Sequence, residues 1–169
     1  MSNFFKDRDE RGAPLEILIA NDFHARGIPV GFNPASGTED PTREDYDLYT
    51  GLPGAATFWE VKMDWMSGLT GRTFIEEKTL RNTKASKMIV GRLMLDVFDV
   101  QRLREMFDER LQTPVYDERK SIWLMTRYKH VIGGDQADNM GMLLDWRDVK
   151  ANSRPLWAVT KELKQNAHV

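Results

Sequence analysis

Two acidic residues and a lysine stand close together around one predicted strand, and their types and spacing could support metal-dependent chemistry. Glu60 and Lys62 are two residues apart, so in a strand their side chains point to the same face. Asp47 precedes a Gly-Leu-Pro-Gly turn at 51–54, which places it on the strand that pairs with the one carrying Glu60. Side chains opposite each other on paired strands lie within about 5 Å, close enough for two carboxylates to share a cation. The pattern predicts a Mg²⁺ site, because Mg²⁺ prefers hard oxygen ligands and keeps several waters.

A simpler explanation of the same charges stays open at this point. Glu60 and Lys62 could form an ordinary ion pair on an exposed strand face, and such pairs are common. The neighbouring Phe58 and Trp59 argue against it, because a strand with these residues is expected to have a buried face. A charge held near that apolar surface is costly unless it has a partner or a function.

Several segments of the chain resemble one family of enzymes. Asp47, the turn and Glu60-Val61-Lys62 resemble the D…ExK signature of the PD-(D/E)XK nuclease superfamily, and Glu16 matches an acid that many members carry on the first helix. The segment 70–76, Thr-Gly-Arg-Thr-Phe-Ile-Glu, is similar to a Thr-Gly-Asn-x-Phe-Ile-Glu segment of phage and prophage endonuclease-like proteins. Residues 133–135 and 141–144 also resemble that group, in its closing strand, so the resemblance covers most of the chain.

The resemblance implies a fold and an activity. The fold is mixed α/β, with a restriction-endonuclease-like core in which a central mixed sheet is flanked by helices. The activity is Mg²⁺-dependent hydrolysis of DNA phosphodiester bonds by a phage-encoded endonuclease, with Mn²⁺ able to replace Mg²⁺. The alternative is a nuclease-like fold that has lost catalysis and serves as a nucleic-acid-binding or assembly module. Related nucleases often work as dimers, so a homodimer is a further expectation.

The same resemblance assigns roles to individual residues. It implies that Asp47, Glu60 and the backbone carbonyl of Val61 hold the metal ion. Lys62 would stand beside the attacking water and favour hydroxide through its positive charge. Glu16 would bind a second ion or orient water, and Glu76 is a further candidate for this role. For Glu16 and Glu76, ordinary solvent-facing positions remain the alternative.

A run of basic residues follows the predicted site and could contact the phosphate backbone of DNA. Such contacts give an affinity that falls with salt and carry little sequence information. No segment reads as a base-specific element, so a structure-selective or nonspecific nuclease is expected. A solvated basic loop is the alternative. The candidate contacts are Arg72, Lys78, Arg81, Lys84 and Lys87.

The elements that must position these residues follow from hydrophobic periodicity. Apolar residues at helical spacing predict helices at 14–26 and 100–111, and a partly helical tail from Arg147. The apolar segment 88–98 predicts one bent strand or two short ones. The other predicted strands are 28–32, the segment around Leu48, 57–65, 74–80, 121–127 and 140–146.

Length and composition predict one globular domain over residues 1–169. The chain has 41% hydrophobic and 30% charged residues and a net charge of −2, which is ordinary for a globular protein. It has no cysteine, which excludes disulfides and thiolate metal sites. No apolar run is long enough to cross a bilayer, so we expect no membrane association and a cytoplasmic location, which is the host cytoplasm for a phage protein.

Overall fold

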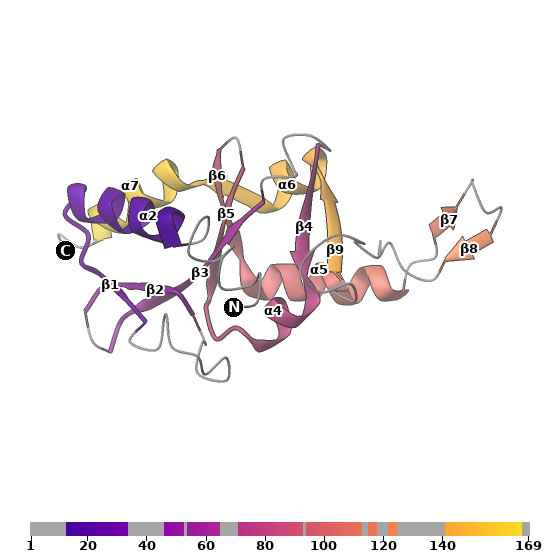
Figure 1. Ribbon diagram of the computed structural model, residues 1–169, viewed down its shortest axis with the longest axis horizontal. Coiled ribbons are helices and arrows are strands. Elements are labelled where there is room, and N and C mark those ends of the chain that lie inside the picture. The colour runs from indigo at the N-terminus through magenta and orange to yellow at the C-terminus, as the bar shows by residue number, and fades with distance from the viewer. Residues whose placement is uncertain are drawn as a thin grey trace, which may run out of the picture.

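The fold is built on one central sheet with helices around it. The computed structural model describes residues 13–33, 46–52, 54–64, 71–92, 94–112, 115–117, 122–124 and 141–166. The sheet is mixed and six-stranded, with the order β1-β2-β3-β5-β6-β10, and this confirms the predicted mixed α/β class (Figure 1). Only β3 and β5 run parallel, and the other neighbours are antiparallel. The six strands are β1 (Val30–Phe32), β2 (Leu48–Thr50), β3 (Thr57–Met63), β5 (Lys87–Gly91), β6 (Leu95–Asp99) and β10 (Ser153–Pro155).

One face of the sheet packs against two helices from opposite ends of the chain, α2 (Ala13–Ala25) and α7 (Leu156–Asn166). Alternate residues of the strands, Trp59 and Val61 on β3 and Ile89 on β5, point into this layer and are buried. The Phe23 ring lies 5.3 Å from that of Trp59, so α2 is fixed directly against β3.

The other face is covered by three helices and a second, two-stranded sheet. The helices are α4 (Glu77–Asn82), α5 (Val100–Gln112) and α6 (Trp146–Asn152), and the strands are β4 (Arg72–Glu76) and β9 (Gly141–Asp145). Met88 and Val90 of β5 point into this layer, one residue out of phase with those of the first face. In the register of β3 and β5, Glu60 lies beside Met88 and Lys62 beside Val90. Glu60 and Lys62 therefore lie on the α4 side of the sheet.

Most predicted elements are present, but one is wrong. The predicted strand 74–80 is instead the end of β4 followed by α4, a six-residue helix whose single buried residue is Leu80. A helix this short shows no helical repeat in the sequence. The segment 88–98 resolves into two strands, β5 and β6, which pair antiparallel. No helix of the described part of the chain is both long and apolar enough to cross a membrane.

The elements found after residue 115 largely match those predicted from the sequence. The predicted strand 140–146 is β9, and the partly helical tail consists of α6, β10 and α7. The predicted strand 121–127 contains β8 (Ile122–Leu124), which pairs with β7 (Val115–Asp117) in a hairpin that stands apart at the right of Figure 1. Residues 133–135, part of the family resemblance, lie outside the described residues.

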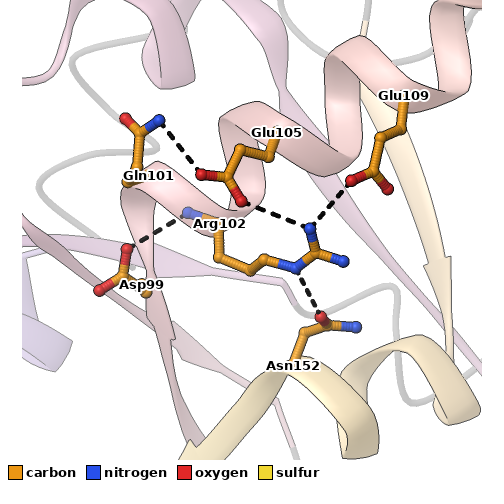
Figure 2. Close-up of polar contacts among 6 residues, drawn as sticks. All are labelled: Asp99, Gln101, Arg102, Glu105, Glu109 and Asn152. Atoms are coloured by element: carbon orange, nitrogen blue, oxygen red, sulfur yellow. Dashed lines mark hydrogen bonds and ion pairs between the residues drawn. The ribbon is translucent and has the colours of Figure 1, made fainter.

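A polar network on the outer side of α5 joins it to α6 (Figure 2). The Nε of Arg102 donates to Oδ1 of Asn152 at 3.2 Å, and its Nη1 lies 3.0 Å from Oε1 of Glu109. The hydrogen bond that Arg102 donates to Glu109, helped by the charges of Glu109 and Glu105, raises the pKa of Arg102. Glu105 and Glu109 are exposed and Arg102 and Asn152 are half-buried, so the ion pairs of this network contribute little to stability.

Thr73 on β4 gives a test of the packing between β4 and the core. Its side chain is fully buried, and its hydroxyl has no hydrogen-bond partner within the described structure. Burying a hydroxyl without a partner costs about 1–3 kcal/mol. We expect Thr73→Val, which keeps the shape, to raise the free energy of unfolding in urea by about 1 kcal/mol.

Thr160→Val is the matched control for this measurement. Thr160 is equally buried, but its hydroxyl donates to the carbonyl of Trp157 at 3.0 Å. Removal of a satisfied hydroxyl gives no comparable gain. A Thr73→Val protein no more stable than wild type would show that the Thr73 hydroxyl is hydrogen-bonded in solution.

Candidate active site

The β2–β3 hairpin brings Asp47 to Glu60, as the sequence predicts. The two strands pair with Leu48 opposite Trp59, and the turn between them contains Gly51 and Gly54 at positive φ, 95° and 90°. These backbone conformations favour glycine. Asp47 stands one residue before β2, and its N–H donates to the carbonyl of Trp59 at 2.9 Å. The hairpin thus holds the backbone of Asp47 next to the middle of β3.

The carboxylate of Asp47 lies at the edge of β3 where the pairing with β2 stops. Its Oδ2 accepts a hydrogen bond from the N–H of Val61 at 2.6 Å. In an extended strand, the N–H and the C=O of one residue point to the same side. The carbonyl of Val61 therefore points to the edge occupied by Asp47, so the two oxygen groups predicted to bind metal lie on one side of the strand.

Glu60 is buried and carries two polar contacts. Its residue is 7% exposed. Its Oε1 lies 3.1 Å from Nζ of Lys62, and its Oε2 accepts a hydrogen bond from the hydroxyl of Thr83 at 2.9 Å. The side chain of Lys62 is 43% exposed, but its ammonium is held against the buried acid. Because Glu60 is buried, Glu60 and Lys62 do not form an ordinary ion pair on an exposed strand face.

The electrostatics of Asp47 indicate a surplus of negative charge. Burial, together with the charge of Glu60, raises the pKa of Asp47 to about 8. Lys62 and the hydrogen bond from Val61 lower that pKa, and the charge of Glu16 raises it. At neutral pH the Asp47 carboxyl is therefore mostly protonated. The negative charges of Asp47 and Glu60 repel each other, so the two carboxyl groups cannot both ionise easily. A cation bound beside them would relieve this repulsion.

Lys62 responds to the same charges in the opposite direction. Burial lowers the pKa of its ammonium, but the charges of Glu60 and Asp47, with the hydrogen bond to Glu60, outweigh this effect and raise the pKa above its usual value. Lys62 therefore keeps its positive charge throughout the physiological range. It can hold and polarise a water molecule, but it cannot act as a neutral base.

Glu16 and Glu76 also lie within electrostatic reach of the pair. Glu16, on the first turn of α2, is 8% exposed, and its charge acts on Asp47. Glu76, the last residue of β4, acts on Lys62, and its Oε2 accepts a hydrogen bond from the hydroxyl of Thr79 at 2.9 Å. The solvent-facing alternative is wrong for Glu16, which is buried.

Arg81 and Lys87, which belong to the five predicted basic contacts, form ion pairs within the protein. Arg81 forms an ion pair with Asp108, with Nη2 2.6 Å from Oδ1, and its guanidinium lies 4.7 Å from the centre of the Phe107 ring. Lys87 pairs with Asp99 at 2.9 Å. The structure gives no support for these two as phosphate contacts. The other three, Arg72 at the start of β4, Lys78 on α4 and Lys84 just after it, are exposed.

Thr83 is a residue of the site that the sequence did not reveal. It follows α4 directly and reaches Glu60, which lies 23 positions earlier, through its hydroxyl. A single threonine after a short helix has no spacing that distinguishes it from other threonines. Only the tertiary placement of α4 against β3 brings the two side chains together.

The chain was compared with known proteins, and neither family models nor curated proteins gave a match. The assignment of chemistry therefore depends on the geometry. Within the described residues, no group of three or more acidic or histidine side chains is arranged to hold a metal ion. The available donors are the Asp47 and Glu60 carboxylates and the Val61 carbonyl. This all-oxygen set fits Mg²⁺, which is commonly bound by one or two carboxylates and completed by water.

Proposed function

We propose that this protein is a Mg²⁺-dependent nuclease that hydrolyses DNA phosphodiester bonds. The observation that carries the proposal is the placement of Asp47, Glu60 and Lys62 around one edge of β3, with burial and mutual repulsion of the two acids. A central mixed sheet with a helix before the hairpin is also what a restriction-endonuclease-like core requires. The resemblance in the sequence supplies the choice of DNA as substrate, and a phage-encoded enzyme of this kind would act in the host cytoplasm.

Each residue has a proposed role, taken from the resemblance, with which its contacts agree. Asp47, Glu60 and the Val61 carbonyl would hold the metal ion, and Glu16 would complete this set or orient water. When bound, the ion supplies neutralising charge for the attacked phosphate and lowers the pKa of water. Lys62, fixed by Glu60 and permanently charged, would position the attacking water and oppose the negative charge that develops on the phosphate.

A second function is favoured by one observation. Within the part of the chain that the structure describes, no group of three acidic or histidine side chains is arranged to hold a metal ion, although the charges of Glu16 and Glu60 both act on Asp47. A protein that keeps the fold but binds metal poorly would act as a nucleic-acid-binding or assembly module. The two functions differ in one measurable property, which is DNA cleavage that depends on a divalent ion.

The test is a cleavage assay with four DNA substrates, namely supercoiled, linear, single-stranded and branched, each with Mg²⁺, Mn²⁺ or a chelator. The nuclease proposal predicts cleavage of at least one substrate with either ion and none with chelator. Calorimetric titration of Mn²⁺ into the protein, without DNA, gives a separate measure of the site. Absence of both cleavage and metal binding would reject the nuclease and leave the assembly module. Sedimentation of the protein with and without DNA would test the homodimer.

Lys78 provides a test of how DNA would be bound. It is exposed on α4, the helix that Thr83 directly follows, whereas Lys87 is paired with Asp99. Each lysine that neutralises a phosphate adds about 0.9 to the slope of log affinity against log salt. We expect Lys78→Ala to reduce that slope by about 1, measured by fluorescence anisotropy in Ca²⁺ or chelator.

Lys87→Ala is the control for this measurement, since it removes a lysine of the same stretch that is already paired. Its salt slope should equal that of wild type. Equal slopes for wild type and Lys78→Ala would place the DNA on another surface of the protein.

A further inference from the structure

The short helix α4 contacts the site through the residue that ends it. Thr83 donates its hydroxyl hydrogen to Oε2 of Glu60 at 2.9 Å, and both residues are buried. An ionised carboxylate only accepts hydrogen bonds, so at this distance the threonine must be the donor. The other oxygen of Glu60 faces the ammonium of Lys62. Glu60 is therefore held by one group on each oxygen.

The hydroxyl of Thr83 is itself fixed in direction. Its oxygen accepts a hydrogen bond from the N–H of Ala85 at 3.1 Å. With an acceptor position filled by Ala85, the O–H points toward Glu60 rather than rotating to the backbone. A side chain whose own rotation is restricted can orient the group that it binds.

The backbone of Thr83 is anchored from the neighbouring helix. Arg104 of α5 donates from Nη2 to the carbonyl of Thr83 at 2.7 Å and from Nε to the carbonyl of Leu80 at 3.0 Å. These bonds satisfy carbonyls that the end of a helix leaves without intrahelical partners. The last turn of α4 is thus tied to α5, and the position of Thr83 relative to β3 is set by two elements rather than by a loop.

We infer that Thr83 is a positioning residue that holds the carboxylate of Glu60 in the orientation needed to bind the metal ion. This inference rests on the proposed function. Thr83 touches neither metal nor substrate, and it acts through Glu60. Groups that hydrogen-bond a ligating carboxylate commonly change metal affinity or activity by about 10–100-fold when removed. Loss of the hydroxyl should therefore weaken metal binding while leaving the ligands themselves in place.

The experiment measures Mn²⁺ binding to the full chain without DNA, by the electron paramagnetic resonance signal of free Mn²⁺. Thr83→Val and the smaller Thr83→Ala both lack the hydroxyl, and each should raise the dissociation constant about 10-fold or more. Thr83→Ser keeps the donor and should bind as wild type does. Thr73→Val is the matched control, because it removes a buried hydroxyl that has no partner in the described structure. Unfolding curves confirm that each variant is folded.

Cleavage gives a second readout that a purely structural role would not produce. The Mg²⁺ dependence of Thr83→Val should shift to higher concentration and approach the wild-type maximum at saturation. If the wild-type protein binds Mn²⁺ and neither Thr83→Val nor Thr83→Ala changes the dissociation constant, the inference is overturned and the nuclease proposal stands. A wild-type protein that binds no Mn²⁺ would overturn the nuclease proposal and, with it, the role of Thr83.

Discussion

Lys62→Ala is expected to slow DNA cleavage by about 10²–10³-fold, the range typical for loss of one preorganised group that stabilises developing charge. The ammonium of Lys62 is fixed 3.1 Å from Glu60 and keeps its charge, so its loss removes the group that would hold the attacking water. It is not a metal ligand, and Mn²⁺ binding should change far less than the rate does. Single-turnover cleavage and calorimetry on the same preparation separate these two quantities.

Two further lysine variants sharpen the result. Lys62→Arg keeps a positive charge but changes the geometry of the donors, so it should recover part of the rate. Lys164→Ala removes an exposed lysine near the end of α7 and should cleave as wild type does. Cleavage by Lys62→Ala at the wild-type rate would remove Lys62 from the chemistry and reject the assigned site.

Asp47→Asn should abolish metal binding and cleavage and yet stabilise the metal-free fold at pH 8. The Asp47 carboxyl has a pKa of about 8 in the folded protein, against 3.8 for an ordinary aspartate, because of burial and the charge of Glu60. Between these two values the folded protein holds a proton that the unfolded chain releases. The free energy of unfolding therefore falls as pH rises, by up to about 1.4 kcal/mol per pH unit from this group.

The substitution removes that slope. Asparagine stays neutral at every pH, and its carbonyl oxygen can still accept the hydrogen bond from Val61. Urea unfolding with chelator at pH 4, 6 and 8 should show little difference between variant and wild type at pH 4. The advantage of the variant should then grow with pH and level off above about 8.

Asp108→Asn serves as the control, because the side chain of Asp108 is 53% exposed on α5. It should follow the pH dependence of wild type. If Asp47→Asn is no more stable than wild type at pH 8, the carboxyl of Asp47 ionises without cost, and the two acids do not form the crowded pair described above.

The centre of the site could be predicted from sequence because it depends on local rules. The alternation of a strand places Glu60 and Lys62 on one face, and the glycines of the turn specify a hairpin that returns Asp47 to them. These relations involve residues close in the chain. They required no knowledge of which helix covers which face of the sheet.

The surroundings of the site could not be predicted, because they depend on packing between distant segments. Burial of Glu16 follows from the docking of α2 through Phe23 onto Trp59, which periodicity does not reveal. Arg81 looked available for DNA because its partner, Asp108, lies 27 residues later on another helix. The six residues of α4 contain too few apolar side chains to distinguish a helix from the continuation of β4.

The pairing of β4 with β9 has a consequence for how the protein is made. In this ladder Arg72 lies opposite Asp145, so β4 cannot pair until residues 141–145 have been synthesised. During that interval the edge of β4 is open to association with other chains. Nascent or prematurely terminated products that lack β9 should therefore aggregate or recruit chaperones.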